Sequence, residues 1–147
     1  MNIAGSWTVS PDPARYVLDS FALLAFLLGE AGMLRVKTVL NAADRRECRV
    51  YVSWINLGEV LYITERGQGL QRARATLARL QALPIQPLEA TPRAILDAAH
   101  IKATFRLSYA DAFAVVAALE KKATVLTGDP EFKSVEELVQ VEWLGKE

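Results

Sequence analysis

The chain has 147 residues, of which 52% are hydrophobic and 23% charged, a composition typical of one folded globular domain. Its 17 Lys and Arg residues balance its 17 Asp and Glu residues, which excludes a protein that coats nucleic acid through a large positive excess. The balance leaves a nucleic-acid substrate open, because carboxylates gathered around metal ions can cancel a basic rim in the total.

Cysteine usage and hydropathy limit the cellular compartment. The single Cys48 and the single His100 exclude an internal disulfide and a Cys/His zinc site. The longest apolar stretch, residues 21–28, is well short of the roughly 20 residues that span a bilayer. Residues 1–7 have no basic region followed by an apolar one, so a secretory signal is not expected. We therefore expect a soluble, cytoplasmic protein that does not contact a membrane.

The expected elements follow in chain order from apolar runs, caps and breakers. Residues 1–14 have no sustained periodicity and are predicted to form a flexible extension, followed by one domain over residues 15–147. Predicted strands cover residues 15–18, 49–52, 84–88, 123–127 and 139–143. Predicted helices cover residues 20–28, 32–46, 54–66, 69–82, 92–105 and 108–122.

The alternation of strands and helices predicts an α/β fold with a central, mostly parallel sheet and helices on both faces. Pro84 and Pro87 suit an edge strand, and residues 139–143 alternate like an outer strand. In such sheets, functional residues gather at the carboxyl ends of the strands, where the chain order reverses.

Two acidic residues stand at predicted strand ends. Asp19 ends the first strand, and Asp129 follows the strand over residues 123–127 in a Thr-Gly-Asp-Pro turn. Local structure alone could explain both, Asp19 as the N-cap of the next helix and Asp129 as a turn residue. Their shared position at the functional edge of a parallel sheet makes them candidate site residues as well.

Two further acids lie on apolar helices. Glu59 shares a helix face with Asn56, and a carboxylate in such apolar surroundings needs a cation or a hydrogen-bond donor unless it faces solvent. Asp111 follows Ser108 by three residues and could belong to a capping box. The helix beyond it is apolar on every face as far as Leu119, which predicts that Asp111 lies at the buried start of a central helix.

Together, these four carboxylates could converge on one pocket. Neighbouring carboxylates raise each other's pKa unless a cation is present, and ligand sets made only of oxygen select Mg²⁺ or Mn²⁺. A metal site of this kind can bridge phosphate oxygens, lower the pKa of a water molecule and stabilise a leaving 3′ oxygen.

The sequence resembles the PIN-domain ribonucleases in four motifs that occur in that family's order. They are VLDS at residues 17–20, NLGEV at 56–60, LSYADA at 107–112 and LTGDPEF at 126–132. Their spacing and the chain length most resemble VapC-type toxins of VapBC toxin–antitoxin pairs. The resemblance covers residue 15 to the C-terminus, and the leader of 14 residues departs from the short members of the family.

The resemblance implies a PIN-like fold and a single-strand-type endoribonuclease that depends on Mg²⁺ or Mn²⁺ and is held inactive by a cognate antitoxin. Its products would carry a 5′ phosphate and a 3′ hydroxyl. The residues that match the family's acidic cluster are Asp19, Glu59, Asp111 and Asp129, and those that match supporting positions are Ser20, Asn56 and Thr127. Asp129 matches the family's most variable ligand, which often acts through water.

Three other functions remain to be weighed. A housekeeping PIN nuclease would process RNA without an antitoxin, and a catalytically silent PIN module would only bind, although four intact acids argue against the latter.

A phosphoacceptor receiver needs adjacent acids after its first strand and a lysine after its last. Here Ser20 and Phe21 follow Asp19, and the first lysine after Thr127 is Lys133. The Asp-x-Asp pair of haloacid-dehalogenase-like phosphatases is absent.

Two partner contacts are expected. The helices over residues 21–28 and 54–63 are more hydrophobic than one covered face requires, which predicts a homodimer. An antitoxin arginine could take the place of a metal ion among the acids, because a guanidinium can bond two carboxylates at once.

His100 lies near no nucleophile motif and is predicted to be structural or to lie on the surface.

Overall fold

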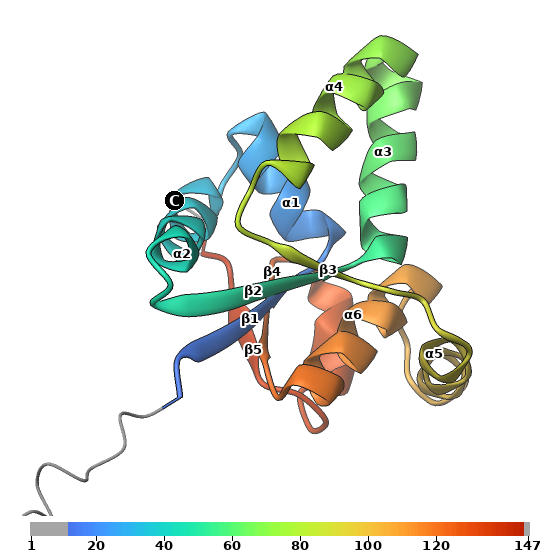
Figure 1. The fold of residues 1–147 in the computed structure, drawn as a ribbon. Helices are drawn as coiled ribbons and strands as arrows, with labels where there is room; N and C mark the ends of the chain where they lie inside the picture. The colour runs from blue at the N-terminus through green and yellow to red at the C-terminus, as the bar shows by residue number, and fades with distance from the viewer. Residues whose placement is uncertain (1–11, 146–147) are drawn as a thin grey trace, which may run out of the picture.

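Five parallel strands form one sheet at the centre of the computed structural model, which describes residues 12–145. The strand order is β3-β2-β1-β4-β5 (Figure 1). The strands are β1 (Ala14–Leu18), β2 (Cys48–Ser53), β3 (Gln86–Leu88), β4 (Thr124–Thr127) and β5 (Val141–Trp143). The predicted α/β class and central parallel sheet are confirmed.

Helices cover both faces of this sheet, as predicted. They are α1 (Ser20–Leu28), α2 (Met33–Asp44), α3 (Trp54–Gln68), α4 (Leu70–Gln81), α5 (Pro92–Thr104) and α6 (Tyr109–Lys121). In Figure 1, α1 to α4 lie above the sheet and α5 and α6 lie below it. Right-handed crossovers explain the division: the chain moves outward from β1 to β2 and β3, then reverses to reach β4, so the later helices fall on the other face.

Each face of the sheet has its own hydrophobic core. Leu18 of β1 points toward α1 to α4 and packs with Leu23, whereas its neighbour Val17 points toward α5 and α6 and packs with Phe113. Successive side chains of a strand alternate between faces, and here both faces are covered. This is why the strands are apolar without interruption in the sequence.

The ends of several elements differ from the sequence prediction. The strand expected over residues 84–88 is limited to Gln86–Leu88, and the helix expected to reach residue 46 ends at Asp44. Arg46 has a φ of 60°, in the left-handed region, which is incompatible with continuing the helix. The edge positions of β3 and β5 are confirmed. A 3₁₀ helix, η1 (Pro130–Val135), follows β4 and was not predicted.

The extension predicted over residues 1–14 lies mostly outside the described residues, which begin at residue 12, and β1 already includes Ala14. Among residues 12–145, no helix is both long enough and apolar enough to cross a bilayer.

Chain order reverses between β1 and β4, the two central neighbours. From β1 the chain continues to one side of the sheet, and from β4 to the other. The carboxyl ends of these two strands therefore form the switch point at which open parallel sheets bind ligands. Asp19 directly follows β1, and Asp129 follows β4 by two residues.

Candidate active site

Asp19 is completely buried at the carboxyl end of β1. One carboxylate oxygen, Oδ1, accepts a hydrogen bond of 2.9 Å from the Ala22 amide and so caps α1. The other, Oδ2, accepts one of 2.5 Å from the Thr127 hydroxyl. Burial raises the pKa of Asp19 to about 7, although these two hydrogen bonds oppose the shift. Asp19 therefore acts as a helix cap, as its local context predicted, and also lies at the site.

Asp111 lies in the first turn of α6 and is 4% exposed. The capping role belongs to Ser108, whose Oγ accepts a 3.1 Å hydrogen bond from the Asp111 amide. Burial, and then the negative charges of Asp19 and Asp129, raise the pKa of Asp111 to about 8. The carboxylate of Asp111 thus faces the two aspartates at the strand ends.

Asp129 is the most accessible of the three aspartates. Its amide donates a 3.0 Å hydrogen bond to the Thr127 hydroxyl, and its Oδ1 accepts one of 2.9 Å from the Glu131 amide at the start of η1. Its charge contributes to the raised pKa values of both Asp19 and Asp111. Thr127 connects two of the acids, because it donates to Asp19 and accepts from Asp129.

Asn56 and Ser20 hold three helices together beside this cluster. Asn56 is fully buried, and its Nδ2 donates hydrogen bonds of 3.2 Å to Ser20 Oγ on α1 and of 3.2 Å to the Ala110 carbonyl on α6. Ser20 Oγ in turn donates a 3.3 Å bond to the Asn56 carbonyl. Asn56 Oδ1 is buried and has no hydrogen-bond partner among the described residues. An acceptor in this position favours a bound donor, such as an ordered water.

Glu59 is less closely associated with the cluster than the sequence led us to expect. It is half-buried on α3, one turn after Asn56, and accepts a long hydrogen bond of 3.4 Å from the Tyr62 hydroxyl. It is not among the main causes of the raised pKa of Asp19 or of Asp111. The structure therefore brings Asp19, Asp111 and Asp129 into electrostatic contact and leaves Glu59 outside this group.

The cluster has the chemistry of a site for a hard cation, but not yet its geometry. In the part of the chain that the structure describes, no three His, Cys, Asp or Glu side chains converge closely enough to enclose a metal ion. Among the same residues, no Lys or Arg forms an ion pair with the three aspartates. Buried carboxylates without a counter-ion are costly, and oxygen donors favour Mg²⁺ or Mn²⁺. The donor set fits such an ion.

A side chain that the sequence analysis did not select, Phe21, packs against the loop that carries Asp129. Its ring lies so close to Gly128 that a Cβ atom there would be 2.3 Å from Phe21 Cε1. The ring remains 42% exposed. The only signal in the sequence is an aromatic residue two positions after Asp19, and nothing in the sequence shows that it crosses to the β4 loop.

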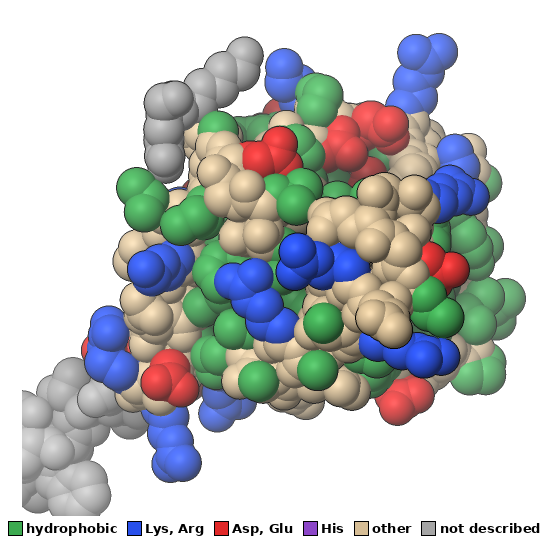
Figure 2. Space-filling view, turned by 90° about the horizontal axis from the view of Figure 1, so that it is seen from above, with side chains coloured by type: hydrophobic (Ala, Val, Ile, Leu, Met, Phe, Trp, Pro, Cys, Tyr) green, Lys and Arg blue, Asp and Glu red, His purple; other side chains and the backbone are tan. Residues whose placement is uncertain are grey.

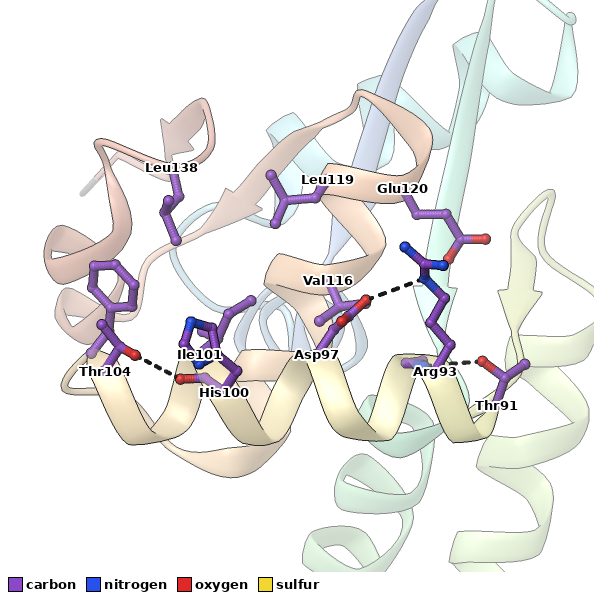
Figure 3. Close-up of a pocket in the computed structure, with 12 residues that line it drawn as sticks. Thr91, Arg93, Asp97, His100, Ile101, Thr104, Val116, Leu119, Glu120 and Leu138 are labelled. Carbon is purple, nitrogen blue, oxygen red and sulfur yellow. Dashed lines mark hydrogen bonds and ion pairs between the residues drawn. The ribbon is translucent and has the colours of Figure 1, made fainter.

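A larger cavity, of about 720 Å³, lies away from the acids between α5 and α6. Figure 3 shows side chains from α5, among them Ile101, rising toward Val116 and Leu119 of α6. The exposed His100 lines this cavity, which confirms its predicted surface position. None of the four predicted acids lines it.

Positive charge is dispersed over the face formed by α1 to α4. Figure 2 shows Lys and Arg side chains spread among acidic and hydrophobic ones on this face. Arg72, Arg74 and Arg79 on α4 are exposed, and the Arg79 guanidinium lies 5.3 Å from the centroid of the Phe26 ring. This arrangement is that of a solvated helix surface.

The sequence matches the PIN domain family profile over residues 16–138. The chain belongs to the PIN-domain family. This assignment confirms the resemblance seen in the four motifs.

Solved structures with the same fold include three from toxin–antitoxin systems. DNA-bound VapBC from Salmonella typhimurium has a TM-score of 0.70 and 18% identity, covering 90% of this chain and 99% of that one. VapBC2 from Rickettsia felis, bound to a promoter DNA fragment, has a TM-score of 0.68 and 14% identity, with coverage of 89% and 99%. VapC20 from Mycobacterium tuberculosis, a Sarcin-Ricin loop cleaving toxin, has a TM-score of 0.64 and 19% identity, with coverage of 83% and 95%. A search of curated proteins gave no match.

Proposed function

We propose that this protein is a metal-dependent endoribonuclease and the toxin of a type II toxin–antitoxin pair. The observation that carries the proposal is the group formed by Asp19, Asp111 and Asp129 at the switch point of a PIN domain. Two of the three are buried, and no basic side chain among the described residues is paired with any of them. A buried group of acids of this kind is suited to a divalent cation.

Asp19, Asp111 and Asp129 would hold the ion, and Glu59, which lies outside this group on α3, would join them only as a further ligand when the ion binds. Mg²⁺ or Mn²⁺ supplies a Lewis acid that lowers the pKa of a water molecule and neutralises charge on a leaving oxygen. The chain's own residues prepare the site. The Thr127 hydroxyl and the Ala22 amide orient the Asp19 carboxylate.

Asn56 has a positioning role in this proposal. Its amide fixes the start of α3 against Ser20 on α1 and against the Ala110 carbonyl beside Asp111. The relative placement of α1, α3 and α6 thus depends on one buried side chain. Because small displacements of catalytic groups are costly, this contact would keep the carboxylates at a working separation.

RNA is the substrate that we propose, with products carrying a 5′ phosphate and a 3′ hydroxyl. One structural relative, VapC20 from Mycobacterium tuberculosis, is described as cleaving the Sarcin-Ricin loop. The neutral net charge and the dispersed basic side chains favour an enzyme that engages RNA through a small site and not through an extended basic surface.

The proposed regulator is a cognate antitoxin, because similar folds occur in VapBC complexes. It would lie along exposed apolar side chains of α1 and α3, among them Leu28, Trp54, Tyr62 and Ile63, and place an arginine among the aspartates. Some of the same apolar surface would serve the proposed homodimer. Replacing that arginine with alanine should relieve inhibition more than it weakens binding.

The test of the proposed function combines purified protein with cellular RNA in Mg²⁺, in Mn²⁺ and in excess chelator. Cleavage that needs the metal and yields 5′-phosphorylated ends supports the proposal, whereas no cleavage in either metal contradicts it. Expression with and without the neighbouring gene then tests the toxin assignment. Cleavage without growth arrest would instead favour an RNA-processing nuclease that has no antitoxin.

A further inference from the structure

We propose that Phe21 is a stacking platform for an unpaired base of the substrate, placed beside the phosphodiester that the aspartates hold. The proposal rests on the proposed nuclease function, for which single-stranded RNA is already the expected substrate, and names the side chain that would hold a base beside the cleaved bond. It makes Phe21 a residue that determines specificity, in addition to the acids.

The position of the Phe21 ring is set by both strands of the switch point. Phe21 lies in the first turn of α1, two residues after Asp19, and its ring lies against Gly128. A Cβ atom at position 128 would be 2.3 Å from Phe21 Cε1 and 2.6 Å from Cζ. Gly128 separates Thr127, which donates to Asp19, from Asp129. The ring therefore rests directly on the backbone between two groups of the site.

The exposure of Phe21 is not explained by the needs of the core. The next two residues of α1, Ala22 and Leu23, are completely buried and supply its contact with the sheet. Phe21 is 42% exposed and lies outside both hydrophobic clusters. A single exposed apolar residue is common on protein surfaces, but this one lies against the loop that carries Asp129.

Stacking would supply affinity that the acids cannot supply. Carboxylates repel phosphates, and the neighbouring face has only dispersed positive charge. Stacking of a base on an aromatic side chain contributes about 1–3 kcal/mol, and proteins read single-stranded RNA by holding splayed bases on such rings. A base resting on Phe21 would bring its own phosphate toward Asp129. A paired base is not free to do so, which predicts a preference for single-stranded sites.

The first test compares two enzymes on two substrates. The probe is a short unstructured RNA of mixed sequence, cleaved by the wild-type protein in Mg²⁺ and mapped to find the cut bond, together with versions that carry an abasic ribose on either side of it. Phe21→Leu should lower kcat/KM on the intact RNA by about 5- to 150-fold, which corresponds to the cost of one lost stacking contact. An abasic ribose at one of the two positions should lower kcat/KM of the wild-type protein by a similar factor. The same change should lower kcat/KM of Phe21→Leu little further, because that variant has already lost the stacking contact.

Two further variants separate stacking from structural damage. Phe21→Trp keeps an aromatic face and should retain most of the activity, whereas Leu96→Ala, which removes exposed apolar surface from α5 on the other face of the sheet, should leave kcat/KM unchanged. Gly128→Ala would displace the ring without removing it. It should lower kcat/KM in the wild-type background and have a much smaller effect when Phe21 is already leucine.

Each outcome distinguishes the platform from the proposed nuclease. If Phe21→Leu cleaves intact RNA as well as the wild-type protein, or if both enzymes suffer the same abasic penalty, the platform is wrong and the nuclease assignment stands. If Phe21→Leu changes only inhibition by the neighbouring gene's product, the ring is a protein contact and the platform is also wrong. If the wild-type protein cleaves no RNA in Mg²⁺ or Mn²⁺, the proposed function fails, and the platform fails with it.

Discussion

The aspartate group and the α5–α6 cavity are two very different polar-lined regions of one small fold. The cavity encloses about 720 Å³, yet its charged residues are exposed, and Arg93 and Asp97 lie 3.8 Å apart as an ion pair. In the aspartate group, Asp19 and Asp111 are buried with raised pKa values and form no ion pair with a basic side chain among the described residues. A large apolar pocket is the usual first choice for a binding site. Here, buried acids that form no ion pair among the described residues are the stronger indication of chemistry.

The largest difference between the regions should be in catalysis. Asp19→Asn and Asp111→Asn should each reduce RNA cleavage to background, because each removes a charged oxygen ligand. Asparagine is itself a good N-cap, so α1 should survive the change at position 19. Asp97→Asn in the cavity is the matched control and should cleave as the wild-type protein does. An Asp19→Asn protein that still cleaves RNA in Mg²⁺ would exclude the aspartate group as the active centre.

The second difference should appear in the pH dependence of stability. In the folded, metal-free protein the pKa of Asp19 is raised from 3.8 to about 7 and that of Asp111 from 3.8 to about 8. The folded state therefore binds more protons than the unfolded state between these values, and the free energy of unfolding should fall as pH rises from about 4 to 8. Because each pKa unit corresponds to about 1.4 kcal/mol of differential stability, the fall should be large enough to measure.

Urea denaturation across this pH range, in excess chelator, measures the effect. Asp19→Asn should flatten the profile, and Asp97→Asn should keep the wild-type slope. Adding Mg²⁺ at the alkaline end should restore stability to the wild-type protein, because a ligand that binds only the folded state stabilises it. If the free energy of unfolding of the wild-type protein stayed constant or rose with pH, the two acids would not be buried without a paired cation, and this interpretation would be wrong.

A smaller effect is expected from the hydroxyl that connects two of the acids. Thr127→Val removes the hydrogen bond to Asp19 and the acceptor of the Asp129 amide, which should cost about 1–3 kcal/mol of stability. Losing the donor should raise the pKa of Asp19 further and move the pH profile of cleavage to higher pH. Thr127→Ser keeps the hydroxyl and should restore the profile. Equal profiles for valine and serine would mean that Thr127 is only a packing residue.

The smallest effect is expected in the cavity. His100→Ala should leave both cleavage and its pH profile unchanged, and should alter stability by no more than about 0.5 kcal/mol, as is usual for an exposed residue. Thermal denaturation and the RNA assay together check this. A large loss of cleavage in this variant would give the cavity a role in catalysis that its geometry does not indicate.

Most of the fold could be predicted from the sequence because its elements are marked by local signals. Ser53, Thr91 and Ser108 cap α3, α5 and α6, and such polar residues mark helix starts in a sequence. Uninterrupted apolar strands require a sheet covered on both faces. The 3₁₀ helix η1 was missed, since its six residues are too few to show a periodicity.

The site was predictable where it depends on strand order and unpredictable where it depends on side-chain packing. Asp19 and Asp129 come together because a parallel sheet aligns its strand ends, and Asp111 joins them from the first turn of α6. The distance of Glu59 from that group depends on how α3 lies across the sheet, which no local pattern encodes. The contact between Phe21 and Gly128 joins residues far apart in the chain, so only the assembled structure reveals it.

Titration of Mn²⁺ into the metal-free protein, followed by calorimetry, is the most direct test of the claim that the three aspartates form a divalent-cation site. The wild-type protein and Asp97→Asn should bind Mn²⁺ alike, whereas Asp19→Asn, Asp111→Asn and Asp129→Asn should each lose affinity, with the smallest loss for the more accessible Asp129. Equal affinity in all five proteins, or no binding by the wild-type protein, would show that the buried acids serve some purpose other than holding a metal ion.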